Sequence, residues 1–135
     1  MTPGLLAREA EKLIGCPFRL HGRDPDSGID CIGLLAAAMA GAGRPIVLPT
    51  GYPLRLNDLT RWLPDPAQCG FAVADMPFEP GDVVLTRPGP GQVHLAIAGL
   101  ALSWIHAHAG LRRVVSQTEI GPGSILHHWR LSPTD

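Results

Sequence analysis

Two stretches in the first third of the chain have the apolar spacing of helices. Between Pro3 and Ile14 the apolar residues recur every three or four positions, with Thr2 as a cap before Pro3. A second run, Leu34–Ala40, is rich in strong helix formers and stops at Gly41. We therefore predict one helix over 3–14 and another that ends near Ala42.

The last third of the chain instead alternates apolar and polar residues, which is the period of β-strands. Five short runs have this pattern and are separated by turn residues: Asp82–Arg87, Val93–Gly99, Ser103–His108, Arg112–Gln117 and Ile125–Leu131. Helices first and strands afterwards predict an α+β fold, in which the second helix packs on an antiparallel sheet of about five strands. At 135 residues we expect a single domain, 1–135.

The segment 44–70 is the least periodic part of the chain and contains many prolines. We expect a loop beside a cleft, with a short helix around Asn57–Leu63. Tyr52 and Trp62 either touch a substrate there or pack beneath the loop, and packing is the more common fate of such residues.

Composition limits the possible partners. The net charge of −1 provides no basic surface for nucleic acid or for an anionic membrane, and no apolar run of about 18 residues could cross a bilayer. The three cysteines, an odd number with no short-spaced pair, argue against a disulfide framework and against a zinc ribbon. We expect no cofactor, no nucleic-acid partner and no membrane partner.

Cys31 is the strongest candidate for a reactive side chain. A turn-rich loop leads into it, so it falls in the first turn of the second helix. Unpaired backbone N–H groups and the positive end of the helix dipole would favour the thiolate there. We therefore predict a lowered pKa for Cys31 and a nucleophile, although most free cysteines are simply small buried residues.

A cysteine nucleophile needs a base, and two histidines are placed to supply one. Alternation puts His94 on one face of its strand, and His106 and His108 on one face of the next. If these strands pair, His94 and His106 lie side by side as base and orienting residue. The rival interpretation is a zinc site of His94, His106 and His108, but no carboxylate lies in these runs to act as a base and Cys31 would have no role.

These motifs together resemble the NlpC-type cysteine peptidases, papain-like bacterial enzymes that cut peptidoglycan stem peptides. The resemblance covers most of the chain, from about Leu5 to Val115. Its motifs are Leu13–Gly22, Gly28–Leu34, Glu79–Leu85 and the two histidines, whose separation of 106 − 94 = 12 residues is close to the usual spacing in the family. The sequence of residues 30–35 and the short chain are most similar to the branch of this family that is encoded in phage tails and gene transfer agents.

The resemblance implies that Cys31 is the nucleophile, His94 the general base and His106 the polar third member. It also implies hydrolysis of an amide bond after a γ-D-glutamyl residue. The chain departs from the family pattern at Phe18, where a tyrosine hydroxyl is common, and we expect a lower turnover rate for that reason. His21 is a candidate substitute for the missing hydroxyl.

Further candidates for substrate contact are Asp30, Phe18, His21, Tyr52 and His108, although a carboxylate at position 30 is also explained by helix capping. Glu9, Glu11 and Lys12 exclude the apolar core of a signal peptide, so we expect synthesis in the cytoplasm and delivery to the cell wall by a phage-like tail. The alternatives are a structural tail-tip component with a silent site, or a related thiol amidase or acyltransferase.

Overall fold

The computed structural model describes residues 3–53, 59–60, 63–89, 92–118 and 124–132. Its helices are α1 (Pro3–Glu11), α2 (Cys31–Gly41) and the 3₁₀ helix η2 (Pro66–Cys69). Its strands are β1 (Arg23–Asp24), β2 (Gly28–Ile29), β3 (Phe71–Val73), β4 (Val83–Gly89), β5 (Gln92–Ala98), β6 (Trp104–His108), β7 (Arg113–Gln117) and β8 (Ser124–Leu131). Within the described residues, no helix is both long enough and apolar enough to cross a membrane.

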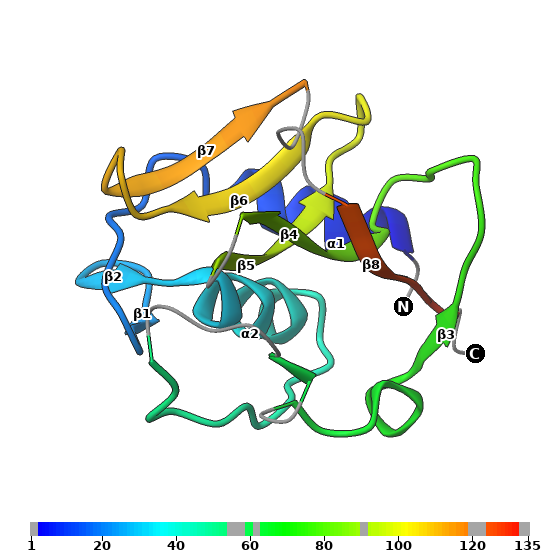
Figure 1. Cartoon of the computed structure of the whole chain (residues 1–135), viewed down its shortest axis with the longest axis horizontal. Helices are drawn as coiled ribbons and strands as arrows, with labels where there is room; N and C mark the ends of the chain where they lie inside the picture. The colour runs from blue at the N-terminus through cyan, green and yellow to red at the C-terminus, as the bar shows by residue number, and fades with distance from the viewer. Residues whose placement is uncertain (1–2, 54–58, 61–62, 90–91, 119–123, 133–135) are drawn as a thin grey trace.

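The large sheet confirms the α+β prediction and all five predicted strands. Its order is β3-β8-β4-β5-β6-β7, with every neighbouring pair antiparallel (Figure 1). It has six strands rather than five, because the short strand β3 pairs with the end of β8. The β1–β2 ribbon was also missed, since two-residue strands in a turn-rich loop carry no periodic signal.

Helices α1 and α2 pack against each other and against one face of the large sheet (Figure 1). The main core between them holds buried residues from both layers, among them Leu6, Leu34, Leu85, Leu95 and Ile97. Helix α1 ends three residues before the predicted Ile14, because 12–15 turn away and the N–H of Gly15 donates to the carbonyl oxygen of Val114 on β7.

The opposite face of the sheet carries a smaller apolar cluster of Val84, Ala96, Ala98 and Trp104, with Phe78 packed against it. The ring of Phe78 meets that of Trp104 edge-on, with centroids 4.9 Å apart. Aromatic pairs favour this geometry, so the cluster closes the second face of a sheet that already buries its first.

A buried ion network ties β8 to the start of β4. The carboxylate of Asp82 is fully buried and accepts hydrogen bonds from His128 Nε2 at 2.6 Å and from Arg130 Nε at 2.8 Å. The backbone N–H of Glu79 also donates to it, at 3.0 Å. A buried charge is tolerated only when it is paired in this way, so the sequence Pro80-Gly81-Asp82 builds a structural joint.

The segment 44–70 agrees in part with its prediction. Its described residues 44–53 have no regular secondary structure, and η2 lies near the end of the segment (Figure 1). The expected helix over 57–63 lies outside the described residues apart from 59–60 and 63, and so does Trp62. Tyr52 is only 4% exposed, so it is packed within the fold.

Candidate active site

Cys31 is the first residue of α2, as predicted. Asp30 caps the helix, because its Oδ1 accepts the backbone N–H of Gly33 at 2.8 Å. Gly33 lets the preceding loop lie directly on the first turn, since a Cβ atom at this position would meet the carbonyl oxygen of Gly22 at 2.1 Å. The loop and the helix start therefore form one rigid support for the thiol.

The predicted pKa of the thiol was wrong in direction. Burial raises the pKa of Cys31 to about 11, and the nearby charge of Asp30 raises it further. The backbone N–H group of Leu95 on β5 lowers it, and so do those of Ile32 and Cys31 at the helix start, but together they do not offset the burial. At neutral pH the resting group is the thiol, so reaction requires a base at the moment of attack.

That base is available in the same cleft. Cys31 and His94 both line one hollow, which is partly open to solvent and has a cavity volume of about 60 Å³. His94 lies near the start of β5, and burial together with the charges of His106 and His108 lowers its pKa. A neutral imidazole can accept a proton from the thiol, so His94 fits the role of general base.

His106 lies beside His94, as the strand pairing predicted. Their ring centroids are 6.2 Å apart, and β5 pairs with β6 through Ile97↔Ile105. His106 Nε2 lies 2.8 Å from Oε1 of Gln117 on β7. An amide oxygen can only accept, so Nε2 of His106 carries the proton and its Nδ1 is left free as an acceptor. Gln117 thus selects the tautomer of His106.

The zinc alternative is not supported. The rings of His106 and His108 lie 5.7 Å apart at their centroids, and Nδ1 of His108 accepts the backbone N–H of Leu111 at 3.0 Å. Across the part of the chain that the structure describes, no three histidine, cysteine or carboxylate side chains are grouped closely enough to hold one ion. His108 does not line the cleft and packs toward its own turn.

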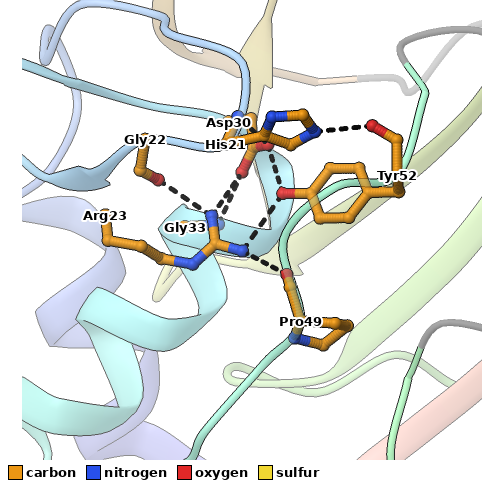
Figure 2. Close-up of polar contacts among 7 residues, drawn as sticks. All are labelled: His21, Gly22, Arg23, Asp30, Gly33, Pro49 and Tyr52. Atoms are coloured by element: carbon orange, nitrogen blue, oxygen red, sulfur yellow. Dashed lines mark hydrogen bonds and ion pairs between the residues drawn. The ribbon is translucent and has the colours of Figure 1, made fainter.

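A second polar group surrounds the carboxylate of Asp30 (Figure 2). Tyr52 donates its hydroxyl to Oδ2, the backbone N–H of His21 donates to the same oxygen at 2.8 Å, and Arg23 donates to Oδ1 at 3.2 Å. Arg23 also donates to the carbonyl oxygen of Pro49 at 2.6 Å. These bonds tie the 44–53 segment to the helix start.

The same contacts decide which residues face the cleft. Phe18, Asp30 and Tyr52 line it, but burial and the bond to Asp30 hold the pKa of Tyr52 well above its usual range. Its proton is therefore committed to Asp30. The Nε2 of His21 donates to the carbonyl oxygen of Tyr52 at 2.6 Å, so it is not free to replace the hydroxyl that Phe18 lacks.

No pattern in the sequence predicts the roles of Arg23 and Gln117. Gln117 ends a predicted strand, and its contact with His106 follows from the β6–β7 register, in which Trp104 faces Gln117 and His106 faces Val115. That register is not readable from either strand alone. Arg23 lies in a polar loop with no periodic signal, and its partner Tyr52 is 29 residues away.

Comparison with known proteins gives the fold an external reference. Two solved structures from Trichomonas vaginalis are similar to this chain: NlpC2, with a TM-score of 0.69 and 17% identity over 98% of the chain, and NlpC1, with a TM-score of 0.61 and 19% identity over 95%. The chain spans about half the length of each, 48% and 45%. No family model matches the sequence, and no curated protein matches it. The likeness shows that the chain has the fold of the NlpC proteins.

Proposed function

We propose that this chain is a cysteine peptidase that hydrolyses amide bonds in peptidoglycan stem peptides. The observation that carries the proposal is the shared cleft of Cys31 and His94, with the thiol at a helix start and His106 beside the imidazole. The NlpC-like fold supports a thiol peptidase of this kind, and the sequence motifs around the three residues support the same assignment.

The reaction would start from a neutral thiol and a neutral imidazole. His94 takes the proton as the sulfur of Cys31 attacks the amide carbonyl, which forms the carbon–sulfur bond. The resulting imidazolium gives its proton to the leaving amine, and the carbon–nitrogen bond breaks. Water then attacks the thioester with His94 again as the base, which releases the acid and restores the thiol.

Gln117 and His106 would keep His94 in the productive tautomer. With its Nε2 proton donated to Gln117, His106 keeps Nδ1 as an acceptor. A hydrogen bond from His94 to that acceptor during the reaction would hold a proton on one nitrogen of His94 and leave the other nitrogen to take the proton of the thiol. This is the logic of a catalytic triad extended by one amide.

The developing oxyanion would be met by backbone N–H groups at the start of α2, which helix geometry leaves without partners inside the helix. Phe18 lines the cleft and contributes no hydroxyl, so we expect slower turnover than in relatives with a tyrosine. Loss of one such donor costs about 10²–10³ in rate.

The finer parts of the proposal rest on sequence resemblance. The first is cleavage after a γ-D-glutamyl residue. The second is delivery to the cell wall as part of a phage-like tail, which is supported by the sequence of residues 30–35. A silent structural tail component is the competing function, and the raised pKa of the Cys31 thiol is the observation in its favour.

The test is digestion of purified stem peptides, with product masses measured for the wild type, Cys31→Ala and His94→Ala. We expect cleavage by the wild type and a loss of at least about 10³ in rate for each variant. His127→Ala, at an exposed position on β8, is the matched control and should cleave normally. Cleavage that survives Cys31→Ala would refute the thiol mechanism, and absence of cleavage by all four proteins would favour the structural role.

A further inference from the structure

The walls of the cleft are apolar around the thiol. Phe18, Leu20, Ile32, Val93, Ala107 and Ala109 all contribute to the lining. Asp30 is the one charged side chain among the lining residues that the structure describes. What the cleft can hold therefore depends on whether the charge of Asp30 is available to a ligand.

The charge of Asp30 is already fully used. Its two oxygens accept four hydrogen bonds, from the backbone N–H groups of His21 and Gly33, from Tyr52 and from Arg23. The residue is only 2% exposed. A carboxylate offers about four lone-pair sites, so no further donor from a substrate ammonium group can be accommodated without displacing one of these partners.

Arg23 cancels the charge and is itself held in place. Figure 2 shows its guanidinium between Asp30, the hydroxyl of Tyr52 and the carbonyl oxygens of Gly22 and Pro49. The bonds to Gly22 and Pro49 are 3.0 Å and 2.6 Å. The hydrogen-bonding groups of both Asp30 and Arg23 are therefore occupied by protein partners, and the pair presents no net charge to the cleft.

We infer that the cleft accepts an uncharged, mainly apolar acyl group beside the reacting carbonyl and discriminates against acyl groups that carry a free carboxylate or ammonium. Among the described lining residues, a charged group brought to these walls would lose water and find no permanently charged side chain that is free to pair with it. The inference rests on the proposed function. For a stem peptide it means that a glutamyl residue with its α-carboxyl group amidated is preferred to one with that group free.

The preference can be measured on the acylation step alone. In this step the sulfur of Cys31 forms a bond to the acyl carbon, the ester C–O bond breaks, and the phenolate leaves while His94 takes the thiol proton. Three activated esters of similar length serve as probes: the p-nitrophenyl esters of butyric acid, of succinic acid with one free carboxylate, and of 4-aminobutyric acid.

The rate of thioester formation on Cys31 is followed by acid quench and intact mass, and each rate is divided by that of N-acetylcysteine with the same ester. We expect the butyryl adduct to form about tenfold faster or more than either charged adduct. Equal or faster reaction with a charged ester would overturn the inference and leave the thiol chemistry standing. Absence of any Cys31 adduct would overturn the proposed function and the inference with it.

A charge placed in the wall provides a second test. Ala109→Lys adds an ammonium group at a small, partly exposed lining residue, and Ala101→Lys adds the same group at an exposed turn outside the cleft. We expect Ala109→Lys to raise the ratio of succinyl to butyryl acylation several-fold, and Ala101→Lys to leave it unchanged. Identical ratios in both variants would contradict the assignment of the cleft as the acyl site.

Discussion

The buried carboxylate of Asp82 offers the sharpest test of how this fold is held together. It lies at the junction of the loop before β4 and the end of β8, where His128 and Arg130 donate to it. The substitution Asp82→Asn keeps the size of the side chain. It removes the charge and turns one acceptor into an amide NH₂ that faces the donors of its former partners.

The size of the effect follows from the number and kind of contacts. Hydrogen bonds to charged groups contribute about 1.5–3 kcal/mol each, and breaking a buried ion pair costs about 3–5 kcal/mol. Arg130 is partly exposed and regains water when its partner is lost, so we expect the lower end of that range. The free energy of unfolding should fall by about 3 kcal/mol and Tm by about 10 °C.

The pH dependence has a defined sign. Burial alone would raise the pKa of Asp82, but the hydrogen bonds from Arg130, His128 and the Glu79 backbone lower it below its ordinary value of 3.8. A group whose pKa is lower in the folded protein stabilises it above the unfolded pKa, and this contribution is lost as the pH falls through the folded pKa. The difference between wild type and Asp82→Asn should thus shrink on acidification.

The assay is urea unfolding of both proteins at about pH 7 and again below about pH 3, followed by far-UV circular dichroism. Asp26→Asn, in the exposed β1–β2 turn, is the matched control and should change the unfolding free energy by less than about 0.5 kcal/mol. The reasoning would be refuted if Asp82→Asn cost less than about 1 kcal/mol near neutrality, or if its cost were the same at both pH values.

Four further predictions concern the candidate site. Because burial raises the pKa of Cys31, iodoacetamide should alkylate it more slowly than free cysteine at neutral pH, as measured by peptide mass; equally fast labelling would contradict the buried thiol. Because the pKa of His94 is lowered, the acid limb of kcat/KM should fall below the ordinary histidine value of 6.5, and a limb above it would contradict the assignment. Gln117→Leu should lower kcat by about tenfold with little change in KM, while Gln117→Glu should move the acid limb upward; neither shift is expected if Gln117 is only structural. Gly33→Ala should lower Tm by more than about 5 °C, since its Cβ atom would collide with a backbone oxygen, and an unchanged Tm would exclude that close approach.

Much of the fold could be predicted because most of its helices and strands have a recognisable pattern of residues within their own sequence. Alternation of apolar and polar residues is enough to predict β4 to β8, because each of these strands buries one face of the sheet. The cap at Asp30 could be predicted because it depends only on the unpaired backbone N–H groups of the helix that follows it. Strand β3 gave no such signal, since three residues cannot display a period, and it exists because the end of β8 offers it a partner.

The resemblance and the strand pattern also brought Cys31, His94 and His106 together correctly as neighbours of one region. They failed on the acidity of the thiol. The favourable N–H groups at a helix start are local and readable from the chain, whereas the burial that raises the pKa comes from segments distant in sequence.

Local patterns along the chain were enough to predict the α+β order, the five long strands and the helix that begins at Cys31, because each depends on neighbours within a few residues. Long-range packing, in contrast, sets the contact of Gln117 with His106, the bonds of Arg23 and Tyr52 to Asp30, and the raised pKa of the Cys31 thiol. These outcomes depend on strand register and on a long loop packed over the helix start, and no local pattern specifies which distant residues will meet.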